Sequence, residues 1–131
     1  MSILQSLPFS HCEPGPECVD GVGNFYLQVL APAPSQLLLS TLYFLDSHGQ
    51  IPSEIHNPDY DPIKQSQIDW FTNISQAQEN DDNDNYMSII FFHIPLPEFR
   101  DPNLVIHAGR RREPTKGPSV NSGFYRALVQ E

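Results

Sequence analysis

One histidine, His93, stands at the end of the most apolar run in the chain. Residues 89–94 read Ile-Ile-Phe-Phe-His-Ile, and Pro95 and Pro97 follow at once. The run is typical of a buried strand, and the prolines cannot continue a central one. His93 is therefore expected at the carboxyl end of a strand, where α/β folds place ligand-binding groups. Its imidazole could bind a transition metal, or it could simply donate a ring proton to a backbone carbonyl as a strand-end histidine.

Basic residues are concentrated near the carboxyl terminus. Six of the seven Lys and Arg residues lie in the last 32 residues, whereas Lys64 alone accompanies 13 acidic residues in residues 1–99. The net charge of −9 argues against broad binding to nucleic acid, so no nucleic-acid partner is expected. The tract around Arg110–Arg112 could hold one anion, or it could be a solvated arginine loop.

Two segments that contain acidic residues could be interpreted as metal-binding sites. Asp46-Ser47-His48 follows an apolar run, and side chains on alternate residues could reach one metal centre. The Gly-Asp-x-x-Asp and Gly-Asn-His-Asp/Glu segments that such a metal site would need do not follow downstream, so a structural strand end is the favoured interpretation. The acidic residues 81–85 lack the Gly and Glu that a calcium loop needs at its sixth and twelfth positions, which favours a solvated turn.

Length and patterning indicate at most one α/β domain. The 131 residues are 39% hydrophobic, and 13 prolines favour extended connections over long helices. There is neither an apolar run of membrane-spanning length nor a signal peptide, so we expect no membrane segment and, by default, a cytoplasmic location.

The apolar patterns predict three strands and two helices. The first two strands should form a hairpin. A helix should begin near Ser66, where Ser66 and Asp69 resemble a capping box, and it should fade by Glu79. The predicted strands span residues 24–30, 38–46 and 87–93, and the last helix lies within residues 121–131.

Five blocks, in this order and at this spacing, carry a resemblance that spans roughly residues 3–129. They are Asp20–Tyr26, Leu42–His48, Gln67–Phe71, Phe92–Glu98 and Asn121–Phe124. Together they resemble the calcineurin-like metallophosphoesterases, in the fungal and plant branch related to purple acid phosphatases. The resemblance implies that residues 1–131 are a partial phosphoesterase domain, an incomplete αββα sandwich of mixed sheets with flanking helices.

The same resemblance implies a chemistry and a set of residues. The family uses a centre of two divalent or trivalent metal ions (Fe, Zn or Mn) to hydrolyse a phosphorylated substrate. His93 matches a metal-ligating histidine of the family's His-x-Pro block. Arg111, Arg112 and Glu113, at the place of a Gly-x-x-Arg-Glu-Gly segment, are with Asn121 the expected substrate-side residues. Asp46 and His48 are alternative metal ligands.

Most of the family's ligand motifs have no counterpart in this chain. The Asp-x-His, Gly-Asp-x-x-Asp and Gly-Asn-His-Asp blocks would lie before Met1, and the Gly-His-x-His block would follow Glu131. We therefore expect an internal segment that binds no metal tightly, with its strands in two faces of the sandwich and at least one sheet face exposed. It could serve a metal-dependent phosphatase through His93 and residues 109–123, or it could be an inactive remnant or interaction fragment.

Overall fold

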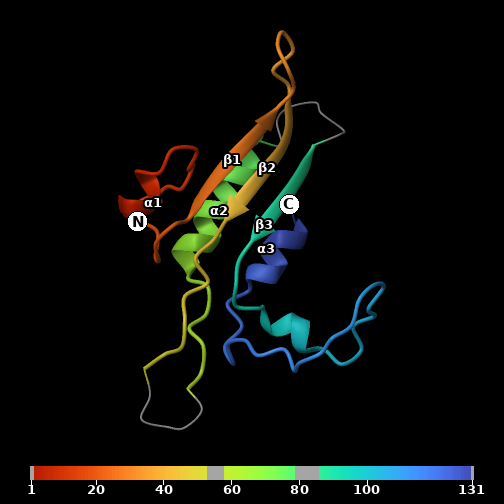
Figure 1. The fold of residues 1–131 in the computed structure, drawn as a ribbon. Coiled ribbons are helices and arrows are strands. Elements are labelled where there is room, and N and C mark those ends of the chain that lie inside the picture. The colour runs from red at the N-terminus through yellow and green to blue at the C-terminus, as the bar shows by residue number, and fades with distance from the viewer. Residues whose placement is uncertain (1, 53–57, 79–85, 131) are drawn as a thin grey trace.

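A computed structural model describes residues 2–52, 58–78 and 86–130 (Figure 1). The acidic turn expected at residues 81–85 lies outside the described residues. Among the described helices, none has the length and apolarity needed to cross a membrane. In chain order the elements are α1 (Ser2–Gln5), β1 (Phe25–Leu30), β2 (Leu38–Phe44), α2 (Gln65–Gln78), β3 (Met87–Phe91), the 3₁₀ helix η1 (Pro97–Arg100) and α3 (Phe124–Gln130).

The three strands form one mixed sheet with β2 in its centre. β1 pairs antiparallel with β2, which confirms the predicted hairpin, and β3 pairs parallel with β2. The α/β class is thus confirmed. The expectation of two sandwich faces is wrong for these strands, because β1 and β3 pair with opposite edges of the same strand. Helices α2 and α3 both lie on one face of this sheet (Figure 1).

The core fills the space between the sheet and the two helices. Tyr43 of β2 is fully buried, and its ring lies edge-on to Phe71 of α2 at 5.0 Å. Phe71 in turn meets Phe124 of α3 edge-on at 5.7 Å. Edge-to-face pairs of this kind add to the free energy that apolar burial contributes. The buried residues of this cluster are Tyr43, Leu45, Ile63, Ile68, Phe71, Leu96 and Phe124.

The opposite face of the sheet is apolar and largely uncovered. Met87, Ile89 and Phe91 of β3 remain 57%, 38% and 48% exposed, whereas Ile90 packs against the core. An exposed sheet face was expected, and this is confirmed. The interpretation of the run before His93 as a buried strand is wrong, because successive side chains of a strand point to opposite faces and only one face is covered here.

Helix α2 begins through a different contact from the one expected. Ser66 lies inside the helix, where its hydroxyl donates to the carboxylate of Asp20 at 2.6 Å. The Gln67 side chain instead reaches back and accepts the backbone N–H of Lys64 at 2.9 Å. That contact is the glutamine half of a capping box whose N-cap residue is Lys64. The prediction of a capping box from Ser66 and Asp69 is therefore wrong in register.

Candidate functional site

A depression of about 780 Å³ opens beside the carboxyl end of β3. It brings one possible metal ligand, two cations and one carboxylate onto a single concave surface, which we call the His93 depression. Its lining residues are Tyr60, His93, Ile94, Pro95, Phe99, Arg111, Glu113, Pro114, Thr115 and Lys116.

Ser47 holds the start of this depression in place. β3 ends at Phe91, two residues before the predicted end, so His93 lies in the turn that follows the strand. The buried hydroxyl of Ser47 accepts the backbone N–H groups of His93 and Ile94 at 3.1 and 2.8 Å. The chain segments after the two parallel strands β2 and β3 are thus tied together at one edge of the sheet. His93 is exposed and lines the depression, and its role as a metal ligand stays a prediction.

The basic loop that follows η1 returns to this edge through close backbone contacts. A Cβ atom on Gly117 would lie 2.2 Å from the carbonyl oxygen of Pro95, so only glycine fits this approach. The Arg111 guanidinium donates to the carbonyl oxygen of Phe99 at 3.0 Å, which holds it beside η1. These contacts bring Arg111 and Lys116 to the same surface as His93.

Further hydrogen bonds hold the end of the basic loop, at Pro118 and Ser119. The backbone N–H and the hydroxyl of Ser119 both donate to the Asp59 carboxylate, and the Arg100 guanidinium donates to the carbonyl oxygen of Pro118. The Ser119 hydroxyl, together with backbone N–H donors, holds the pKa of Asp59 below its usual range. Asp59 is therefore negative at neutral pH and serves as a structural acceptor.

Two of the four expected substrate-side residues line the depression and two do not. Arg111 and Glu113 lie on it, whereas Arg112 is exposed and contributes nothing to the lining. The Asn121 side chain donates to Glu98 Oε1 at 2.6 Å and accepts the backbone N–H of Gly123 at 2.8 Å. Asn121 thus links η1 to the start of α3.

Asp46 and His48 belong to a hydrogen-bond network and do not line the His93 depression. The Asp46 carboxylate accepts the backbone N–H groups of Val22 and His48 at 2.8 and 2.9 Å. The His48 Nε2 atom lies 2.8 Å from Gln67 Oε1. Both side chains therefore have structural partners, and their role as metal ligands stays a prediction.

The described residues do not fit a two-metal centre. A dinuclear site needs several carboxylate or imidazole ligands for each ion. Within residues 2–52, 58–78 and 86–130, no group of three or more His, Cys, Asp and Glu side chains could hold a metal ion.

The structure adds residues that the sequence did not single out. Lys116, Tyr60 and Phe99 join the depression. Lys116 lies in the basic tract, so its charge was a usable signal. Tyr60 lies 33 residues before His93, and no local pattern marked it.

The chain is similar to plant and fungal phosphatase-related proteins. It is 38% identical over 122 residues to "Probable inactive purple acid phosphatase 29" of Arabidopsis thaliana, across 85% of this chain and 31% of that protein. It is 32% identical over 123 residues to "Probable inactive purple acid phosphatase 14" of the same plant, across 86% and 31%. It is 33% identical over 109 residues to "Phosphatase DCR2" of Saccharomyces cerevisiae, across 78% and 18%.

No protein-family model and no solved structure matches the chain. The relatives agree with the resemblance carried by the five sequence blocks. Because the chain spans 31% of each of the two plant proteins, the comparison concerns one segment of them. Over most of its length, the chain is a homologue of a segment of the purple acid phosphatase-like proteins.

Proposed function

We propose that this segment forms the phosphate-binding side of a purple acid phosphatase-like protein, and that the His93 depression receives the phosphoryl group of a phosphomonoester. The observation that carries the proposal is the meeting of His93, Arg111 and Lys116 on one concave surface. The relatives' printed names support a phosphorylated ligand.

The charges of the depression fit this role. Neither Arg111 nor Lys116 forms an ion pair with a carboxylate among the described residues, so their charges are available to an anion. A guanidinium presents a fork of N–H donors that matches phosphate oxygens, and a lysine ammonium adds a mobile point charge. Glu113 on the same surface disfavours a ligand with a second anionic group near it. The depression therefore favours a single phosphoryl group attached to an uncharged alcohol.

Phenyl phosphate binding tests this assignment. We expect Arg111→Gln and Lys116→Gln each to weaken binding about tenfold, because a hydrogen bond to a charged group contributes about 1.5–3 kcal/mol. Arg112→Gln is the matched control, since Arg112 lies in the same loop but outside the lining. Binding is followed by backbone amide NMR shifts around His93. An equal loss in all three variants would mean that only diffuse positive charge attracts the ligand.

A second measurement concerns turnover. We expect the 131-residue chain, supplied with manganese, zinc or iron, to hydrolyse p-nitrophenyl phosphate no faster than its His93→Ala variant. Of the family's metal-ligand motifs, the sequence contains only the one with His93, and one histidine cannot hold two ions. The plant relatives carry "probable inactive" in their names, which points the same way. Metal-dependent turnover that disappears in His93→Ala would contradict this expectation and the alternative of an inactive remnant.

A further inference from the structure

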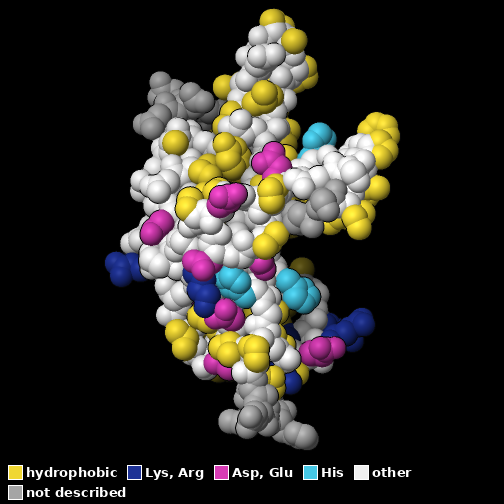
Figure 2. Space-filling view, turned by 90° about the vertical axis from the view of Figure 1, so that its left-hand side faces the viewer, with side chains coloured by type: hydrophobic (Ala, Val, Ile, Leu, Met, Phe, Trp, Pro, Cys, Tyr) yellow, Lys and Arg dark blue, Asp and Glu magenta, His cyan; other side chains and the backbone are white. Residues whose placement is uncertain are grey.

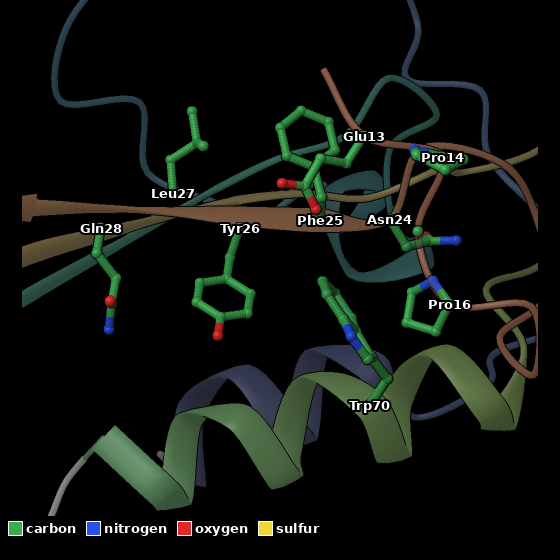
Figure 3. Close-up of a pocket in the computed structure, with 10 residues that line it drawn as sticks. Glu13, Pro14, Pro16, Asn24, Phe25, Tyr26, Leu27, Gln28 and Trp70 are labelled. Atoms are coloured by element: carbon green, nitrogen blue, oxygen red, sulfur yellow. The ribbon is translucent and has the colours of Figure 1, made fainter. Parts of the chain in front are cut away.

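A groove of about 430 Å³ runs along the outer edge of β1 and shares no lining residue with the His93 depression (Figure 3). Its lower wall is Trp70, whose indole rises from α2 toward the strand, beside Tyr26 and Pro16 (Figure 3). The segment from Glu13 to Pro16 closes one end. The groove thus lies between a strand edge, a helix and a proline-rich loop.

β1 presents an unprotected edge to this groove. It pairs with β2 on one side, and no described residue pairs with its other edge. Natural sheets blunt such edges with lysine, proline or inward-pointing charge. The strand reads Phe-Tyr-Leu-Gln-Val-Leu and contains none of these, although its register against β2 shifts between Val29 and Leu30. Its outer backbone N–H and C=O groups are therefore available to pair with another extended chain.

The proline-rich loop limits where such pairing can begin. The Gly23 N–H donates to the Pro14 carbonyl oxygen at 2.7 Å. Gly15 has a φ of +85°, and a Cβ there would lie 2.5 Å from the Asn24 carbonyl oxygen. The loop is thus pressed against the start of β1 at Asn24. An incoming strand can pair with the edge only beyond that residue.

The aromatic walls of the groove are held rigidly by the core. Tyr43, which is fully buried, lies 6.4 Å from Trp70 in an edge-on arrangement and 6.2 Å from Tyr26. Tyr26 nevertheless keeps 39% of its surface exposed. Aromatic faces fixed in this way attract the cationic heads of Lys and Arg side chains.

The acidic residues at the groove favour a ligand that carries positive charge. Glu13 is the only charged residue that lines the groove, and the exposed Glu17 and Asp20 follow in the same loop. Acidic side chains are scattered over the middle and the lower half of this side of the molecule, and basic side chains lie in its lower half and at its margins (Figure 2). Antiparallel pairing with a second copy about a twofold axis would place the acidic loops at opposite ends of the strand pair, and β1 itself carries no cation that could face Glu13.

We propose that the β1 edge and its groove form a docking site for an extended, lysine- or arginine-bearing segment of a partner protein, which adds to the sheet as a fourth strand. Backbone hydrogen bonds to β1 would provide affinity, and alternate side chains would provide specificity. Cationic side chains of the segment reach Glu13 or stack on Trp70 and Tyr26. This site is independent of the His93 depression and of the proposed phosphate binding.

Trp70, the only tryptophan of the chain, reports on this groove through its fluorescence. The probe is an octapeptide of alternating lysine and valine. We expect a saturable change in Trp70 emission that weakens with added salt. Two control peptides should each bind at least tenfold more weakly. In one, glutamate replaces every lysine, which removes the cations. In the other, alternate backbone amides are N-methylated, which removes their hydrogen-bond donors. Glu13→Gln should weaken binding several-fold, and the exposed Glu17→Gln, outside the lining, should leave it unchanged.

Three results would overturn the proposal. The first is equal binding of the lysine and glutamate peptides, and the second is undiminished binding of the N-methylated peptide. The third is a dimer, detected by sedimentation, that the peptide does not dissociate and whose stability changes in Glu13→Lys. Such a dimer would mean that a second copy of the chain occupies the groove. Phosphate binding at the His93 depression should be unaffected by Glu13→Gln, so failure of either proposal can be recognised separately.

Discussion

Replacing Gln67 by methionine is expected to lower the free energy of unfolding by about 3 kcal/mol or more, because a buried polar group that loses its partner costs about 1–3 kcal/mol. Gln67 is fully buried at the start of α2. Its Nε2 group donates to Asn24 Oδ1 and to the Asp46 carbonyl oxygen at 2.9 and 2.6 Å. Its Oε1 atom accepts the Lys64 backbone N–H at 2.9 Å and lies 2.8 Å from His48 Nε2. Methionine keeps the length of the side chain and removes all of these contacts.

The urea midpoint of the far-UV circular dichroism signal measures this effect. The matched control is Gln65→Met, two residues away on the exposed side of the same helix. Gln65 makes one side-chain contact, to Asp69 at 2.8 Å, and its replacement should change stability by no more than about 0.5 kcal/mol. Similar midpoints for the two variants would show that the Gln67 network contributes little to the fold.

Phe124→Ala is expected to be equally damaging, with a loss of about 3–5 kcal/mol, the range measured when a buried phenylalanine is truncated. Phe124 is 1% exposed at the first turn of α3. Its ring meets Phe71 at 5.7 Å and Phe92 at 6.2 Å, both nearly edge-on. Since domains are stable by only about 5–15 kcal/mol, this loss removes a large share of the stability, and the variant should unfold at much lower urea or lose α3 from the sheet.

Val129→Ala on the same helix is the control for this loss. Val129 is 62% exposed, so its truncation removes little buried surface. Amide hydrogen exchange of α3 and of Ile90 separates local undocking of the helix from global unfolding. Unchanged protection of α3 in Phe124→Ala would show that the helix is held by other contacts than the aromatic cluster.

Local patterns in the sequence predicted most of the elements. Alternating apolar residues located β1, and the prolines after it located the hairpin turn. The run ending at Phe44 and the run before His93 located β2 and β3. These features depend on neighbouring residues in the chain, because strand alternation and the restrictions of proline act over a few positions. Ordered short blocks were also enough to identify the phosphatase-like relatives.

Two parts of the fold required contacts that no local pattern contains. The placement of all three strands in one sheet depends on which edges of β2 are occupied. The exposure of Ile89 and Phe91 depends on which face the helices cover. Both are decided by packing between segments far apart in the chain, so the apolar run before His93 could not reveal them.

The candidate site likewise combines features that the sequence predicts with features that only the tertiary structure determines. Sequence alone determined that His93 follows a strand and that cations gather in the loop beyond it. Only the tertiary structure decided that Arg111 and Lys116 join His93 while Arg112 and Asn121 do not, because a close backbone approach at Gly117 sets the path of that loop. It also decided that Asp46 and His48 have structural partners, since Gln67, about twenty residues away, supplies the buried amide between them. The sequence gives the chemical type of each side chain. The groups that the side chain contacts depend on which chain segments are brought together by burial of the core.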